Sequence, residues 1–173
     1  MMTGIFSMDR ELRQLLDSNM HDVPRLYQLA GVTPATVKRY ILDGMAAAIA
    51  ESDWEAWYTL LAMAQAIEQP ETKADVLHNL LLMPGHELHQ EVTRAMQDLG
   101  SPSSVPCIRT VLEGGLDFLA YTGSEDEVIA KWFSHALASI GTPEAIELIR
   151  EFAASDNAGI AGEMRYRLEQ LGC

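Results

Sequence analysis

Apolar residues recur along the chain three and four positions apart, a spacing that places them on one face of a helix. Two sets show this pattern most clearly: Leu60, Leu61, Ala64 and Ile67, and then Ile129, Trp132, Phe133, Ala136, Leu137 and Ile140. No segment alternates apolar and polar residues over the length of a strand, so we expect no sheet. The pattern therefore predicts an all-α chain.

Capping residues, prolines and glycines indicate where the helices begin and end. We expect helices over residues 8–19, 23–30, 34–50, 53–67, 71–83, 87–99, 103–113, 125–140, 143–154 and 157–171. Ser52-x-x-Glu55 and Ser124-x-x-Glu127 have the form of capping boxes, and Thr33-Pro34 has the form of a helix start. Residues 114–123 are the long irregular stretch between predicted helices.

The second half of the chain contains an internal repeat. Residues 92–102 align with residues 133–143 at an offset of 41, with apolar, small, Gly, hydroxyl and Pro positions in common. Each run reads as a helix closed by Gly, followed by Ser or Thr as N-cap and by Pro at the first position of a second helix. The repeat predicts two equivalent helical hairpins, with Ala95 and Ala136 buried where the helices meet.

A family likeness rests on several short runs in this half of the chain. They are His89-Gln90-Glu91, Leu99-Gly100-Ser101-Pro102, residues 136–145, Ala153-Ala154-Ser155-Asp156-Asn157 and Arg167-Leu168. Through them, the chain from about Leu80 to Leu171 resembles the HEAT-like repeats of bacteria, a group that includes bilin-lyase-type repeats. The resemblance implies a short right-handed α-solenoid of HEAT-like helical hairpins, in a single domain over residues 1–173, that presents a curved surface to a partner.

The same resemblance suggests a function. Small standalone members resemble proteins found beside secreted bacterial toxins, which implies a non-catalytic, immunity-type inhibitor that binds and neutralises a toxin. A HEAT-like enzyme of the bilin-lyase type is the alternative that the resemblance leaves open.

The charge balance narrows the choice of partner. The chain of 173 residues has 25 acidic and 12 basic side chains and a formal net charge of −13. Because nucleic acids and anionic membranes bind clustered Lys and Arg, we expect neither as a partner, and expect a basic protein instead. The oligomeric state stays open.

Several absences in the sequence bear on its location. Cys107 and Cys173 form neither a metal-ligand spacing nor a disulfide framework, which fits a reducing compartment. The first ten residues lack the pattern of a secretory signal, and no run approaches about 18 apolar residues. We therefore expect a cytoplasmic protein without a membrane span.

One acidic stretch also carries aromatic residues. Residues 40–72 contain no Lys or Arg, and Trp54-Glu55-Ala56-Trp57-Tyr58 lies inside them. Neighbouring side chains on a helix are about 100° apart, so these three aromatics cannot all face one core. The stretch is either solvated acidic surface with core aromatics, or a partner face with aromatic anchors and steering carboxylates. On the second interpretation the candidate partner-binding residues are Asp53, Trp54, Glu55, Trp57, Asp117, Glu125, Asp126 and Glu127.

The segment His86-Glu87-Leu88-His89 suggests a metal site. Its histidines are three apart, whereas the helix-borne zinc motif needs them four apart. HEAT-like deoxyhypusine hydroxylases, which this chain resembles, hold iron with several His-Glu pairs, and here there is one. We therefore expect no metal, and expect histidines that lie partly exposed on helix 87–99.

Other catalytic patterns are missing from the sequence. There is no Gly-x-Ser-x-Gly elbow and no Gly-rich phosphate loop with its Lys. Cys107 aligns with Leu148 in the repeat and is expected in the core. The sequence thus predicts no catalytic residue, no cofactor and no enzyme.

Residues 26–42 resemble a DNA-binding helix-turn-helix, with residues 30–32 as the turn and Lys38 and Arg39 directed at phosphate. Tyr27, however, stands where that motif favours a small residue. Because a solenoid consists of helix–turn–helix hairpins in any case, a repeat hairpin explains the segment as well. A DNA-binding regulator therefore stays an alternative.

Overall fold

The computed structural model describes residues 10–18 and 22–173, and within these ranges the regular structure is entirely helical. The elements are α1 (Arg10–Asp17), α2 (Val23–Ala30), α3 (Val37–Glu51), α4 (Trp54–Ala66), α5 (Pro70–Leu82), α6 (His89–Leu99), α7 (Ser104–Gly114), the 3-10 helix η1 (Asp117–Thr122), α8 (Asp126–Ile140), α9 (Pro143–Phe152) and α10 (Ala158–Leu171). The predicted all-α fold is confirmed, and the α-helices begin and end within a few residues of the predicted bounds. The outer ends of the helix predicted at 8–19 lie outside the described residues.

The chain divides into two compact units, which are described separately. Unit 1 ends at Leu88 and unit 2 begins at His89. The single domain expected over residues 1–173 stays a prediction.

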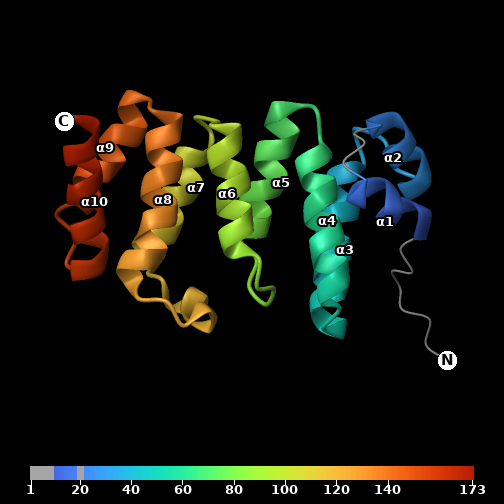
Figure 1. Ribbon diagram of the computed structural model, residues 1–173, viewed down its shortest axis with the longest axis horizontal. Helices are drawn as coiled ribbons and strands as arrows, with labels where there is room; N and C mark the ends of the chain where they lie inside the picture. The colour runs from blue at the N-terminus through green and yellow to red at the C-terminus, as the bar shows by residue number, and fades with distance from the viewer. Residues whose placement is uncertain (1–9, 19–21) are drawn as a thin grey trace. The chain divides into compact units, whose positions relative to one another are not determined.

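Unit 1 is built around the hairpin of α3 and α4. The helix α5 packs against both of them, and α1 packs against α2 and α4 (Figure 1). Its core is apolar and closed to solvent: Ile41, Met45, Leu60, Leu77 and Leu80 are each 0% exposed. Burying five side chains of this size stabilises the unit by roughly 1.5–3 kcal/mol for each.

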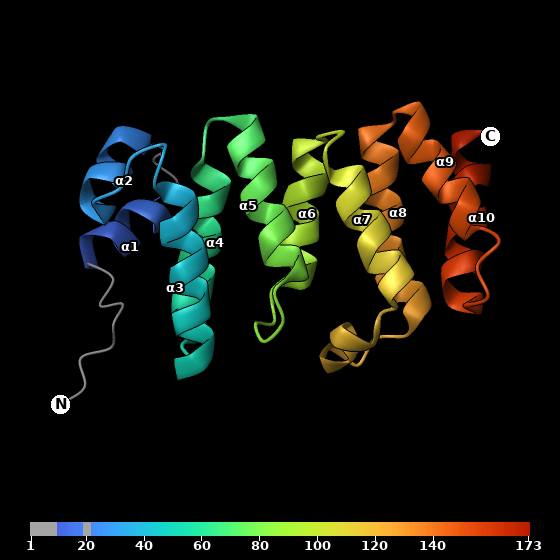
Figure 2. The same cartoon turned by 180° about the vertical axis from the view of Figure 1, so that it is seen from behind.

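Unit 2 has two layers of helices. In one layer α8 packs between α6 and α10, and in the other α7 packs against α9 (Figures 1 and 2). The hairpins α6–α7 and α8–α9 are those that the repeat predicts, and each packs on the next in chain order, as in a solenoid. Ala95 and Ala136 are buried as expected, 8% and 0% exposed.

The closing glycines of α6 and α8 and the start of α9 follow the expected chemistry. Gly100 and Gly141 close α6 and α8 with φ of +61° and +66°, a left-handed conformation that glycine adopts without strain. Thr142 then caps α9, its hydroxyl oxygen accepting from the Ala145 N–H at 3.2 Å. In addition, the Ser139 hydroxyl donates to the Gln97 carbonyl at 2.9 Å and ties the end of α8 to the end of α6.

Some predicted helix starts were wrong. Ser52 is not the N-cap of α4; it closes α3 with a φ of +55°, and the Asp53 carboxylate caps α4 by accepting from Ala56 N–H at 3.0 Å. Ser124 is displaced in the same way, because Glu125 occupies the N-cap position of α8. In both places the helix begins one residue later than the capping box predicts.

Two further differences concern short turns. Residues 33–36 form a hydrogen-bonded turn ahead of α3, closed by Thr33 N–H donating to the Thr36 hydroxyl oxygen at 2.9 Å. Ser101-Pro102 likewise forms a turn, since α7 begins at Ser104. The stretch expected to be irregular at 114–123 contains η1.

Candidate functional site

The exposed side of α4 carries two aromatic side chains. Trp54 is 60% exposed and Tyr58 is 52% exposed, four positions apart and therefore on one face of the helix. The opposite side of α4 supplies Ala56 and Leu60 to the core, each 0% exposed. We call Trp54, Glu55 and Tyr58 the α4 outer face.

The neighbouring acidic residues of α4 have structural roles. The Glu55 carboxylate forms an ion pair with Arg13 at 2.9 Å, with both side chains partly solvated. Asp53 caps the helix, as described above. Trp57 lies on the inner side of this end of α4, partly buried, with its indole Nε1 closed to solvent and without a hydrogen-bond partner in the described residues. Of the two predicted anchors, Trp54 is thus the one that faces solvent.

The other predicted acidic residues belong to unit 2. Asp117 begins η1, and Glu125, Asp126 and Glu127 form the exposed start of α8. Carboxylates at a helix N-terminus interact favourably with the helix dipole, which gives these three a stabilising role of about 0.3–1 kcal/mol each. Because they lie in a different unit from Asp53 and Glu55, the predicted residues form two separately described surfaces.

A polar hollow of about 560 Å³ adjoins the start of α8. There the Asn157 side-chain amide, which belongs to the N-cap residue of α10, donates to the Asp126 carboxylate. Gly159 makes the close approach of the two helices possible, since a Cβ on it would lie 2.8 Å from the backbone nitrogen of Glu127. Of the acids on this surface, Asp126 therefore also joins α8 to α10.

The two histidines of the His86–His89 segment are buried, not partly exposed as expected: each is 1% exposed. Leu88 N–H donates to His86 Nδ1 at 3.0 Å, so the ring carries its proton on Nε2, which donates to the Leu80 carbonyl at 2.8 Å. This is a structural histidine that closes the turn after α5. The bonded ring explains why it is buried.

His89 holds the irregular stretch against α6. Its Nδ1 lies 2.9 Å from the Tyr121 hydroxyl, and its ring packs edge-on against Phe118 with centroids 5.4 Å apart. Within the described residues, no group of three or more His, Cys, Asp or Glu side chains could hold a metal ion.

The basic residues in and next to the helix-turn-helix segment are paired with carboxylates of unit 1. The pairs are Arg25 with Glu11, Lys38 with Asp75 and Arg39 with Asp43. Tyr27 is 9% exposed and belongs to the core between these helices. Arg25, Lys38 and Arg39 are thus each paired with an acidic side chain of the same unit.

Sequence reasoning missed a group of polar residues between α6, α8 and α10. A groove of about 460 Å³ lies between α6 and α8, and its lining carries no carboxylate. We call it the α6–α8 groove; its lining residues are Gln90, Thr93, Arg94, Gln97, Val128, Lys131, Trp132 and His135.

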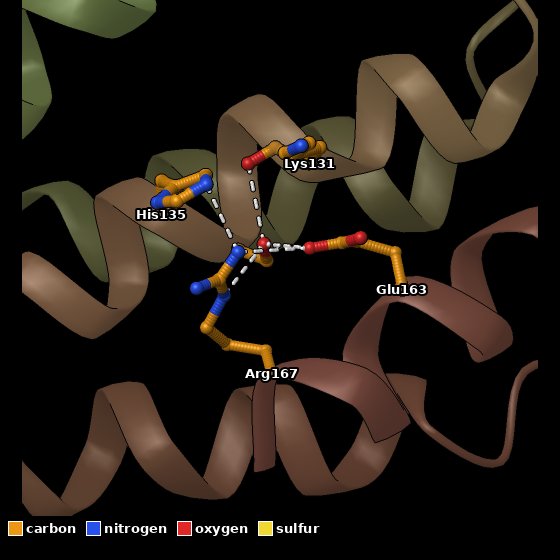
Figure 3. Close-up of polar contacts among 5 residues, drawn as sticks. Lys131, His135, Glu163 and Arg167 are labelled. Atoms are coloured by element: carbon orange, nitrogen blue, oxygen red, sulfur yellow. Dashed lines mark hydrogen bonds and ion pairs between the residues drawn. The ribbon is translucent and has the colours of Figure 1, made fainter. Parts of the chain in front are cut away.

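A buried network adjoins this groove (Figure 3). Ser134 donates to the Glu163 carboxylate at 2.7 Å, and Arg167 donates to the same oxygen at 3.1 Å. The side chains of Arg167 and Glu163 are 11% and 6% exposed, so their ion pair is largely shielded from water. The network joins α8 to α10.

Arg167 determines the protonation and the tautomer of His135. Arg167 Nη2 donates to His135 Nε2 at 2.9 Å, and because a guanidinium cannot accept, the imidazole is neutral with its proton on Nδ1. Partial burial lowers the pKa of His135 below its ordinary value of 6.5, and the nearby charges of Arg167, Lys131 and Arg94 lower it further, against an opposing effect of Glu163.

The repeat itself contained the signal for this groove. At the offset of 41, Gln90 aligns with Lys131 and Arg94 aligns with His135. Equivalent positions of stacked hairpins lie side by side on one face, so polar residues at two such pairs predict a polar strip across α6 and α8.

No protein-family model, no curated protein and no solved structure matches this chain. In the part of the chain that the structure describes, none of the helices has both the length and the apolar character needed to cross a membrane. The resemblance to HEAT-like repeats therefore stays an interpretation of the sequence.

Proposed function

We propose that the chain is a non-catalytic protein-binding module that neutralises a basic partner, as an immunity-type inhibitor does, and that the α4 outer face contacts that partner. The observation that carries the proposal is the exposure of Trp54 and Tyr58 on one face of one helix. Trp and Tyr are enriched among the residues that dominate binding energy at protein interfaces, because each buries a large area with few rotatable bonds.

The charge around this face supports a basic partner. The helix lies inside residues 40–72, which contain no Lys or Arg, in a chain of net charge −13. The negative electrostatic field of an acidic surface raises the rate at which a cationic protein encounters it, and it repels acidic proteins. The pairing of Glu55 with Arg13 reduces the local field but leaves the net charge of the chain unchanged.

The test uses the full-length protein as bait for a cell lysate, beside two matched variants. Trp54→Ala/Tyr58→Ala removes the aromatic side chains of the α4 outer face, and Tyr166→Ala removes a 50% exposed tyrosine from α10 in unit 2. We expect a basic protein to be retained in equimolar amount by the wild type and by Tyr166→Ala, and to be lost from the α4 variant. Equal retention by all three baits, or an acidic protein as the retained partner, would contradict the proposal.

The contribution of Asp53 and Glu55 to partner binding is tested by replacing both with their amides and measuring binding of the purified partner. Asn caps a helix as well as Asp does, so Asp53→Asn keeps the start of α4 intact. Glu55→Gln breaks one exposed ion pair, which contributes about 0–1 kcal/mol to stability. We expect this double variant to associate more slowly at low salt and to dissociate at the wild-type rate, because steering acts on the encounter.

A further inference from the structure

The lining of the α6–α8 groove combines apolar side chains with donors of hydrogen bonds. Val128 and Trp132 lie four positions apart on α8, and Thr93 faces them from α6. Gln90 and Gln97 on α6 are seven positions apart, about 10.5 Å along the helix, which equals the length of about three residues of extended chain. The groove is therefore long enough for a short peptide segment, and its lining includes two amide side chains that can bond a peptide backbone.

The charge of the groove is opposite to that of the molecule. Unit 2 has six Lys and Arg residues: Arg94, Arg109, Lys131, Arg150, Arg165 and Arg167. Arg94, Lys131 and Arg167 are close enough to His135 to act on its charge. Lys131 forms no ion pair within the described residues, and Arg94 reaches only the exposed Asp98, at 3.3 Å.

His135 lines the groove, and one of its two ring nitrogens is already bonded. Arg167 occupies its Nε2, so the proton is on Nδ1, which has no hydrogen-bond partner in residues 10–18 or 22–173. Figure 3 shows this second ring nitrogen on the side of the ring away from Arg167. Since Glu163 and Ser134 hold Arg167 in place, the donor is positioned before any ligand arrives.

We propose that the α6–α8 groove binds an extended peptide segment in which an Asp or Glu side chain lies next to an apolar one. The carboxylate is recognised by Arg94, Lys131 and the Nδ1–H of His135, and the apolar side chain packs against Trp132. This site is independent of the proposed function, because it lies in unit 2 and selects the opposite charge from the α4 outer face.

A nucleic acid would fit the groove less well than a peptide. Glu91, Asp98 and Glu127 are exposed on the same two helices, and a polyanion longer than the groove would meet their carboxylates. Net charge of −13 adds repulsion over a longer range. A single carboxylate flanked by uncharged residues avoids both penalties.

The test is a selection from a phage-displayed library of random heptapeptides on the immobilised full-length protein. We expect peptides with Asp or Glu beside Leu, Ile, Val or Phe to be enriched by the wild type. Arg94→Gln/Lys131→Gln should enrich none of them. The control variant Arg150→Gln, which removes an exposed arginine of α9, should enrich the same peptides as the wild type.

The best peptide is then measured in solution. Replacing its acidic residue by the amide should weaken binding about tenfold or more, as expected for the loss of charge-assisted hydrogen bonds. In an NMR titration, the bound peptide should raise the pKa of His135, because the added carboxylate offsets the cations Arg94, Lys131 and Arg167 while Glu163 stays in place.

Three outcomes would overturn the proposal. They are a failure to enrich any peptide, enrichment that is the same on Arg94→Gln/Lys131→Gln as on the wild type, and displacement of the peptide by an equal concentration of an oligothymidylate. The last outcome would identify the groove as a nucleic-acid site. All variants fall in unit 2, so the result is separate from that of the α4 experiment.

Discussion

The buried network between α8 and α10 makes a quantitative prediction about stability. Glu163→Met keeps most of the side-chain volume and removes the acceptor that Ser134 and Arg167 share. Ser134 retains a weaker contact, since its hydroxyl also lies 3.2 Å from the Lys131 carbonyl. Arg167 retains His135 but loses its counter-charge while only 11% exposed. Removing one member of a buried ion pair costs about 3–5 kcal/mol, and these remaining contacts place the expected loss near the lower end, at about 3 kcal/mol.

Two companion variants separate charge from hydrogen bonding. Glu163→Gln keeps an oxygen that accepts from Ser134 and Arg167, so its cost should be about 1–2 kcal/mol. The double variant Glu163→Met/Arg167→Met removes both charges together and should recover stability to within about 1 kcal/mol of the wild type, because no buried charge is left alone.

The assay is urea unfolding of each purified variant, followed by circular dichroism at the helical band, with stability taken from the linear extrapolation. If the two units unfold separately, the transition of unit 2 is the one to compare. A loss below about 1 kcal/mol for Glu163→Met would refute the idea that this ion pair holds α10 on α8, and so would a double variant no more stable than Glu163→Met alone.

Three further predictions follow from single contacts. Gly159→Ala should destabilise the protein by about 1–3 kcal/mol in the same urea assay, because its Cβ would lie 2.8 Å from a backbone nitrogen of α8. Gly162→Ala has open space around it and should stabilise α10 by about 0.5–1 kcal/mol. Equal effects of the two substitutions would refute the close approach of α10 to α8 at Gly159. Burial raises the pKa of the Cys107 thiol to about 11, so Ellman's reagent at pH 8 should titrate one thiol in the native protein, the exposed Cys173, and two in urea. The pKa of His135 is lowered in the folded state, so the unfolded chain binds more protons as the pH falls through 6.5. The free energy of unfolding should therefore decrease on acidification through this range, and it should decrease less in His135→Gln. The same dependence of stability on pH in the variant would show that another group is responsible.

The fold could be predicted from sequence because its determinants are local. The spacing of apolar residues, with Gly100 and Gly141 as closing residues, sufficed to place α6 and α8 and to pair them as repeats. The helix starts were less certain, because Ser52 and Asp53 are both good capping residues and lie next to each other. Only the geometry of the α3–α4 turn, which puts Ser52 in the left-handed region, decides between them.

The candidate sites depended on long-range contacts, and there the sequence was less informative. Spacing around α4 indicated that its aromatics could not all be buried, and Trp54 and Tyr58 are indeed exposed. Nothing in the segment 86–89 showed that both histidines would be buried, since their partners lie at Leu80 and Tyr121. Likewise, Arg167 could not be connected with His135, 32 residues away, until α10 was placed beside α8.

The most direct test of the central claim is the dissociation rate of the complex between this protein and the basic partner retained by the wild-type bait. Biolayer interferometry with the partner immobilised would compare the wild type with Trp54→Ala. If the α4 outer face anchors the complex, the loss of Trp54 should cost at least about 2 kcal/mol and speed dissociation about 30-fold or more, with little change in association. An unchanged dissociation rate would show that the partner binds elsewhere and that Trp54 is merely exposed.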